Sequence, residues 1–184
     1  MEDKIYIKAF AVIDTNVIIS SMLGTKPSST KEIMSMIKNG NLIPLYDQRM
    51  IDEYSEVIGR FFEDDIVEEK ISEIIENGYM VMDIKETISD FADKDDIPFF
   101  EVKESTKELD PYLITGNTKD FPEDKAVTPA FVIKVMRYLN RFVINDKEKF
   151  LKDFDTILKD LDPTKYKHCC GEELLKGRES EIDR

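Results

Sequence analysis

In the stretch Tyr6-Ile7-Lys8-Ala9-Phe10-Ala11-Val12-Ile13, Lys8 is the only charged side chain. A continuous apolar run of this length is typical of a parallel β-strand that helices cover on both faces. The run ends at Asp14, and residues 17–23 have the composition of the first turns of a helix. In open α/β sheets the functional crevice lies outside the carboxyl ends of the strands. Asp14 is therefore a candidate site residue.

Short apolar segments alternate with longer helical segments along the rest of the chain. Further strands are predicted at residues 42–46, 79–82 and 111–115, with a minimal fifth strand at residues 126–127. Pro44 lacks an amide donor, which predicts that its strand lies near an edge or that Pro44 lies near a strand end. The alternation predicts an α/β fold, with a mainly parallel central sheet of four to five strands flanked by helices.

On the helix predicted after the second strand, two glutamates point in different directions. Asp47 is a predicted N-cap, and apolar residues recur at helical spacing from Met50 to Phe61. At about 100° per residue, Glu53 lies at the border of this apolar stripe and Glu56 points away from it. Glu53 can therefore face a cleft, whereas Glu56 is expected in solvent.

The later helices are indicated by caps and stop signals. Residues 64–76 form a predicted helix that stops at Asn77-Gly78. A polar connection over residues 83–95 follows, and it leads into a helix with Pro98 in its first turn and Asp95 or Asp96 as its cap. Thr128-Pro129 opens another helix.

Residues 1–140 are predicted to form the α/β domain, and residues 141–184 an appendage to it. The appendage is expected to contain a helix near residues 149–158 and a polar, mobile tail from about residue 162. It holds the only histidine, His168, so two-histidine acid–base chemistry is excluded. The adjacent Cys169-Cys170 pair gives no disulfide framework, which predicts a cytoplasmic protein.

The net charge of −13 opposes binding of nucleic acid, but the imbalance is local. Residues 63–96 carry 13 acidic and 3 basic side chains. No apolar stretch approaches the roughly 20 residues that span a bilayer, so no membrane contact is predicted.

Four carboxylates are predicted to share one edge of the sheet. Asp14 and Asp120 follow the first and fourth strands, Asp96 begins the helix before the fourth strand, and Glu53 borders a cleft. Clustered carboxylates repel, and a cation offsets that repulsion. Oxygen ligands suit Mg²⁺ or Mn²⁺, which can activate water for phosphodiester hydrolysis.

Several segments resemble the motifs of PIN-domain nucleases, in the expected order over about residues 5–132, and specifically the branch of toxin components of toxin–antitoxin modules. They are Val12-Ile13-Asp14-Thr15-Asn16-Val17-Ile18-Ile19-Ser20, Asp52-Glu53-Tyr54-Ser55-Glu56-Val57-Ile58-Gly59-Arg60, Asp93-Lys94-Asp95-Asp96-Ile97-Pro98-Phe99-Phe100-Glu101, Leu113-Ile114-Thr115-Gly116-Asn117-Thr118-Lys119-Asp120-Phe121 and Thr128-Pro129-Ala130-Phe131.

The resemblance implies a PIN-like three-layer fold and a metal-dependent endoribonuclease that cleaves single-stranded RNA with Mg²⁺ or Mn²⁺. It also implies a homodimer and an antitoxin partner. The implied metal-binding and catalytic residues are Asp14, Glu53, Asp96 and Asp120, and the implied supporting residues are Asp93, Asn117, Thr15, Asn16 and Thr115.

The chain departs from the family pattern at two places. Many relatives carry aspartate where this chain has Asn117, so the fourth acidic position depends on Asp120. The helix after the third motif, residues 101–105, is more polar than the small-residue helix usual in the family. The alternative reading is therefore a PIN-like module that binds RNA or a protein partner without cutting.

Overall fold

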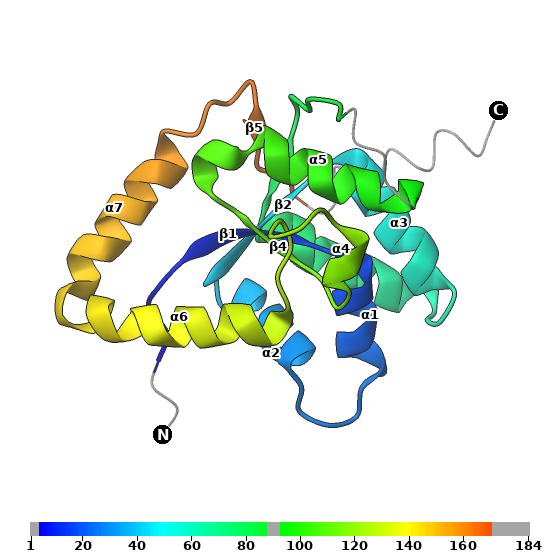
Figure 1. Cartoon of the computed structure of the whole chain (residues 1–184), viewed down its shortest axis with the longest axis horizontal. Helices are drawn as coiled ribbons and strands as arrows, with labels where there is room; N and C mark the ends of the chain where they lie inside the picture. The colour runs from blue at the N-terminus through cyan, green and yellow to red at the C-terminus, as the bar shows by residue number, and fades with distance from the viewer. Residues whose placement is uncertain (1–3, 88–92, 171–184) are drawn as a thin grey trace.

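A computed structural model describes residues 4–87 and 93–170 of the chain. Its centre is a five-stranded sheet in the order β4-β1-β2-β3-β5 (Figure 1). Strands β1 (Ala9–Ile13), β2 (Leu42–Tyr46), β3 (Tyr79–Val81) and β4 (Tyr112–Ile114) are parallel, and β5 (Tyr166–Lys167) is antiparallel to β3. The predicted α/β fold with a mainly parallel sheet is confirmed.

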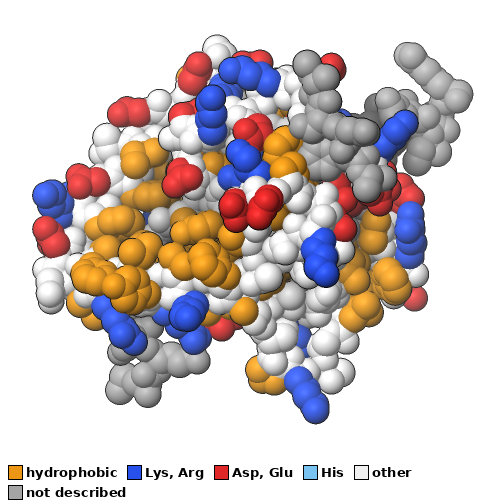
Figure 2. All heavy atoms as spheres, viewed as in Figure 1, with side chains coloured by type: hydrophobic (Ala, Val, Ile, Leu, Met, Phe, Trp, Pro, Cys, Tyr) orange, Lys and Arg blue, Asp and Glu red, His pale blue; other side chains and the backbone are white. Residues whose placement is uncertain are grey.

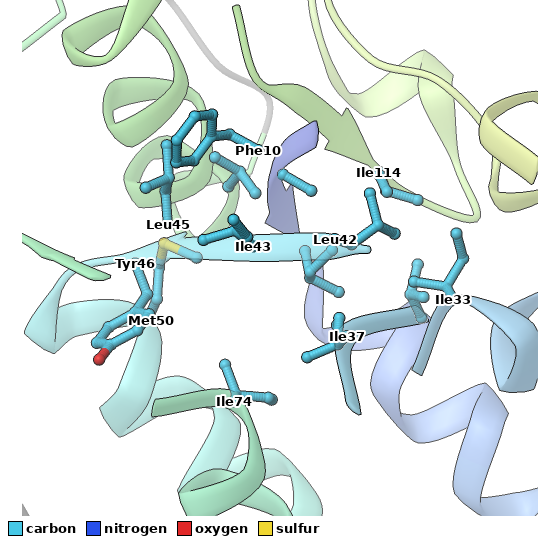
Figure 3. Packing of buried hydrophobic residues seen from close by; sticks show 14 of the residues in the cluster. Phe10, Ile33, Ile37, Leu42, Ile43, Leu45, Tyr46, Met50, Ile74 and Ile114 are labelled. Atoms are coloured by element: carbon cyan, nitrogen blue, oxygen red, sulfur yellow. The ribbon is translucent and has the colours of Figure 1, made fainter. Parts of the chain in front are cut away.

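Helices cover both faces of this sheet, which explains the unbroken apolar character of β1 and β2. Figure 3 shows Phe10 and Leu45 on one side of β2 and Ile37 and Ile74 on the other. All five residues of β2 are buried. A strand with no solvent-exposed face has no position for alternating polar residues.

Most predicted helices form at the expected places, and Asp47 caps its helix as predicted. Asp14, Ser28, Asp47 and Thr128 each accept a hydrogen bond from a backbone amide in the first turn of the helix that they precede. The helices are α1 (Thr15–Leu23), α2 (Ser29–Lys38), α3 (Gln48–Gly59), α4 (Asp64–Glu76), α5 (Ile97–Ser105), α6 (Pro129–Val143) and α7 (Lys147–Lys159). The expected domain boundary after residue 140 falls inside α6.

Pro44 was predicted to mark an edge strand or a strand end, and both are wrong, because β2 is the central strand and Pro44 is its middle residue. The ladder between β2 and β3 begins one residue later, at Leu45. Pro44 therefore immediately precedes that ladder, where a missing amide is tolerated. Gly78, the residue before β3, approaches Pro44 closely: a Cβ added at Gly78 would lie 2.4 Å from the carbonyl oxygen of Pro44.

The fifth strand was predicted at the wrong place. Val127 makes only an isolated parallel bridge with Ile114, and the fifth strand is β5, in the segment predicted to be a mobile tail. Tyr166 is buried against the core, and so is Cys169 beyond it. Two strand residues between polar neighbours give too short a pattern to detect, and pairing with β3 fixes them. Residues 171–184 of that tail lie outside the described part of the chain.

The polar residues of α5 have structural partners. The carboxylate of Glu101 is buried and accepts hydrogen bonds from Arg49 at 2.7 Å and from the amide of Thr87 at 2.7 Å. The hydroxyl of Ser105 accepts one from the amide of Lys85 at 2.8 Å. The polar character of this helix therefore anchors the connection that follows β3. Residues 88–92 of that connection lie outside the described residues.

Apolar side chains also remain at the surface of α6 and α7, and Figure 2 shows them gathered on the face that carries these two helices. Phe142 on α6 is the most exposed, with 66% of its surface accessible. None of the described helices combines the length and the apolar character needed to cross a membrane.

Candidate active site

The candidate site begins where β1 and β4 end side by side. Ile13 pairs with Ile114, so the residues that follow them, Asp14 and Thr115, meet at the same edge of the sheet. The Thr115 hydroxyl donates to Asp14 Oδ2 at 2.6 Å, across 101 residues of sequence. Asn16 Nδ2 donates to the same oxygen at 2.6 Å. These two hydrogen bonds hold the Asp14 side chain in one orientation. Only 5% of the surface of Asp14 is exposed.

Asn16 connects Asp14 to the loop after β4. Its Oδ1 accepts a hydrogen bond from the amide of Gly116 at 2.9 Å, and its Nδ2 also donates to Thr115 Oγ1 at 3.2 Å. A Cβ at Gly116 would lie 3.1 Å from Asn16 Oδ1, closer than side chains normally approach. Glycine at this position therefore lets the loop pass close to Asn16.

Burial favours the protonated form of Asp14, and this is the largest influence on its pKa, which is raised above the ordinary value. The hydrogen bond from Thr115 and the amide of Asn16 act in the opposite direction, because they stabilise the ionised form. The negative charge of Asp120 raises the pKa further.

Glu53 reaches the site from α3, as its position at the border of the apolar stripe predicted. The Thr15 hydroxyl donates to Glu53 Oε1 at 2.5 Å. The next residue, Tyr54, is fully buried and donates its hydroxyl proton to the carbonyl oxygen of Ile13, which attaches α3 to the end of β1. Glu56 is exposed, as predicted, and pairs with Arg60. The helical geometry therefore separates the two glutamates as the sequence indicated.

The pKa of Glu53 is raised to about 7. Partial burial is the main cause, and the charges of Asp14, Asp95 and Asp96 add to it, while the hydrogen bond from Thr15 opposes them. The carboxylate is thus partly removed from water and surrounded by like charges.

Asp96 lies at the junction of the short 3₁₀ helix η1 (Lys94–Asp96) and α5. Asp96 takes the N-cap position of α5, one of the two residues predicted for it, but its side chain makes no cap hydrogen bond. Asp93 caps η1 instead, and its Oδ1 accepts from the amide of Asp95 at 3.0 Å. The extra 3₁₀ turn moves the capping role two or three residues towards the N-terminus and leaves the Asp96 carboxylate available.

Burial raises the pKa of Asp96 to about 7, and the charges of Asp14, Asp120, Asp93 and Asp95 contribute. Asp120 comes from the 3₁₀ helix η3 (Thr118–Asp120), where its side chain is exposed. Asn117 orients it by donating from Nδ2 to Asp120 Oδ2 at 2.7 Å. Asn117 therefore supports the fourth acidic residue rather than replacing it.

The structure brings the other three predicted carboxylates within electrostatic reach of Asp14. Asp14 interacts with each of the other three, Glu53, Asp96 and Asp120. They do not form a closed set of ligands: among residues 4–87 and 93–170, no three or more Asp, Glu, His or Cys side chains are arranged so that they could hold a metal ion. The convergence is therefore electrostatic, with several of the carboxylates turned towards hydroxyl and amide donors.

Sequence reasoning missed two contributors to the site. Asp95 was considered only as a helix cap, yet its charge raises the pKa of both Glu53 and Asp96. Tyr54 was assigned to the apolar stripe, and nothing in the periodicity indicates that its hydroxyl reaches β1. A further carboxylate at a strand end, Asp47, is not part of the cluster, because it caps α3 and pairs with Arg49 at 2.6 Å.

The model of the PIN domain family matches residues 11–119, more than half of the chain. The chain belongs to the PIN domain family. PIN domains are generally nucleases, which supports a nuclease-type function for this one, and they usually use divalent metal ions. The match ends one residue before Asp120. No curated protein and no solved structure matches the chain significantly.

Proposed function

We propose that this PIN domain is a metal-dependent endoribonuclease that hydrolyses phosphodiester bonds of single-stranded RNA. The observation that carries the proposal is the meeting of Asp14, Glu53, Asp96 and Asp120 at the carboxyl edge of the sheet, with the pKa values of Glu53 and Asp96 raised to about 7. Unbalanced negative charge of this kind favours binding of a cation.

The residues present suit Mg²⁺ or Mn²⁺. All four candidate ligands are carboxylates, the oxygen donors that both ions prefer. Glu53 uses Oε1 for its bond to Thr15, and Asp120 uses Oδ2 for its bond to Asn117. The second oxygen of each carboxylate is not needed for these bonds. Because Asp120 is exposed, the cluster is open to solvent on one side, where water and a phosphate can enter.

A bound ion would activate a water molecule and stabilise the leaving oxygen. The chain itself supplies the orientation of the carboxylates. Thr115 and Asn16 favour the ionised form of Asp14 by hydrogen bonds, and Thr15 fixes the position of Glu53. A cation would also favour the ionised forms of Glu53 and Asp96, so its binding should release protons near neutral pH.

The test compares two glutamates on one helix. Single-stranded RNA is incubated with the wild type, Glu53→Gln, Glu56→Gln and Asp14→Asn, with Mg²⁺, with Mn²⁺ and with EDTA. We expect cleavage by the wild type and Glu56→Gln, with losses on the order of 10²-fold or more in the other two variants. Equal cleavage by wild type and Asp14→Asn would exclude the assignment.

Proton release gives a readout independent of activity. Mg²⁺ is titrated into the protein at pH 7 by calorimetry in buffers that differ in ionisation enthalpy. A buffer-dependent heat is expected for the wild type and for Glu56→Gln, and a smaller one for Glu53→Gln. A heat that does not depend on the buffer in any variant would contradict a metal site built on Glu53.

A second function, binding without cleavage, is favoured by one observation: the described carboxylates are not arranged to hold a metal ion as they stand. A chain of this kind would bind RNA in EDTA and in Mg²⁺ alike, and would show no metal-dependent hydrolysis. The cleavage assay separates the two functions directly.

The resemblance of the acidic motifs to the toxin branch supports a further proposal, that the nuclease is the toxin of a toxin–antitoxin pair and that an antitoxin restrains it. Expression of the wild type should then arrest growth, whereas expression of Glu53→Gln should not. Co-expression of a small protein encoded beside it should relieve the arrest. Growth that is unaffected by the wild type, at verified expression, would count against a toxin role.

A further inference from the structure

An open cavity of about 600 Å³ borders Gly116, in the loop that follows β4. It is lined by residues 24–28, which connect α1 to α2, by the start of α2, by Gly116 and by the start of α6. Figure 1 shows the first turns of α6 next to α2. The volume falls in the range of about 300–1,000 Å³ that is usual for small-ligand sites.

Gly116 connects the cavity to the site. It lines the cavity, and its amide donates to Asn16 Oδ1 at 2.9 Å. Asn16 in turn donates to Asp14 at 2.6 Å. A single side chain, Asn16, therefore links the wall of the cavity to the buried carboxylate.

The lining of the cavity has the chemistry that binds a sugar–phosphate backbone. The residues that line it include Lys26 and the hydroxyl-bearing residues Ser20, Thr25 and Thr128. None of the described residues that line it is Asp or Glu, although the chain has a net charge of −13. Lysine and hydroxyl side chains are the usual partners of phosphate and sugar oxygens.

Pro27, Pro129 and Ala130 add an apolar surface to this wall, against which a ribose or the face of a base can lie. We infer that the cavity binds the nucleotide next to the scissile phosphate and that Lys26 contacts its phosphate. The inference rests on the proposed ribonuclease function. Because contacts to phosphate and sugar carry no sequence information directly, binding at this position is independent of the base.

Ala130 allows the charge of the cavity to be tested without loss of the fold. It is exposed and is the second residue of α6, where a glutamate interacts favourably with the helix dipole. Ala130→Glu places a carboxylate in the cavity, and Ala130→Gln adds a side chain of similar size without charge. Lys26→Gln removes the cation, and Lys159→Gln, at the exposed end of α7, is its control.

Binding of a short labelled single-stranded oligoribonucleotide is measured by fluorescence anisotropy in EDTA over a series of salt concentrations. We expect Ala130→Glu to weaken binding about tenfold relative to Ala130→Gln, equivalent to the loss of one favourable charge contact. Lys26→Gln should reduce the slope of log K against log salt by about 0.7, the value for one phosphate contact on a single strand. Lys159→Gln should leave the slope unchanged, and replacing one homopolymer by another should not alter these differences.

The outcomes separate this inference from the proposed function. Equal binding by Ala130→Glu and Ala130→Gln, or an unchanged slope in Lys26→Gln, overturns the inference while metal-dependent cleavage by the wild type still supports the nuclease. The expected differences without any cleavage support the cavity and overturn the nuclease. A wild type that neither binds nor cleaves RNA overturns both.

Discussion

Replacing Asp96 by asparagine should stabilise the metal-free protein at alkaline pH. Asp96 is partly buried at the start of α5, and burial together with the charges of Asp14 and Asp120 raises its pKa to about 7. Its side chain makes no cap hydrogen bond to α5, so the substitution removes no capping interaction. The main effect is the removal of an unfavourable charge.

The direction of this change in stability follows from the two protonation states of Asp96. A raised pKa means that folding disfavours the ionised carboxylate. The penalty is absent below about pH 4, where Asp96 is protonated in both the folded and the unfolded state. It grows as the pH rises and is complete above about pH 7. The stability that protonation provides is therefore lost as the pH rises through the folded pKa.

The size of the effect follows from the shift. A rise from 3.8 to about 7 corresponds to at most ~4 kcal/mol, at 1.36 kcal/mol per pKa unit. Solvent screening of a partly exposed carboxylate reduces this, and we expect a gain of about 1–2 kcal/mol in the free energy of unfolding at pH 8.

Urea unfolding in EDTA at pH 8 and pH 5.5 measures the gain, which should be smaller at pH 5.5. Asp160→Asn, an exposed aspartate that follows α7, is the control for the chemical change and should have little effect at either pH. Mg²⁺ should raise the stability of the wild type more than that of Asp96→Asn. If Asp96→Asn is no more stable than the wild type at pH 8 without metal, the electrostatic account of the cluster is wrong.

Two further predictions concern the fold that carries the site. Gly78→Ala should destabilise by about 1–3 kcal/mol, because the new Cβ would lie 2.4 Å from the backbone oxygen of Pro44. Gly59→Ala is the control, because Gly59 lies in α3 with open space where the Cβ would be, and it should stabilise the protein by about 0.5–1 kcal/mol. Thermal unfolding measures both variants. Similar effects of the two substitutions would contradict this prediction. Arg49→Met should cost about 3–5 kcal/mol because it removes the only cation that pairs with the buried Glu101 carboxylate in the described part of the chain. Adding Glu101→Gln should recover much of that loss in chemical denaturation, and no recovery would show that Arg49 acts through packing instead.

Local patterns in the sequence predicted most of the framework of the site. The apolar run up to Ile13 indicated a strand covered on both faces, and Asp14 was placed in the turn that follows it. Helical periodicity distinguished Glu53 from Glu56, and the structure confirms the difference. These predictions succeed because strand burial, helix faces and caps depend on residues only a few positions apart.

Other predictions failed where a distant segment decides the outcome. Pro44 suggested an edge strand or a strand end, but it lies in the middle of the central strand, immediately before the ladder with β3. The two-residue strand at Tyr166 is formed by pairing with β3, and its own sequence carries no strand pattern. The side-chain cap lies at Asp93, at the start of η1, because a 3₁₀ turn, which no periodicity indicates, precedes α5.

The sequence by itself determined which residue types stand at the strand ends, on which helix faces, and in which order along the chain. Only the tertiary structure decided how the carboxylates interact. The raised pKa values of Glu53 and Asp96 come from burial and from charges carried by other segments, and the hydrogen bond from Thr115 to Asp14 joins residues 101 positions apart. Electrostatic energies and hydrogen bonds depend on distance in space, which the spacing along the chain does not specify.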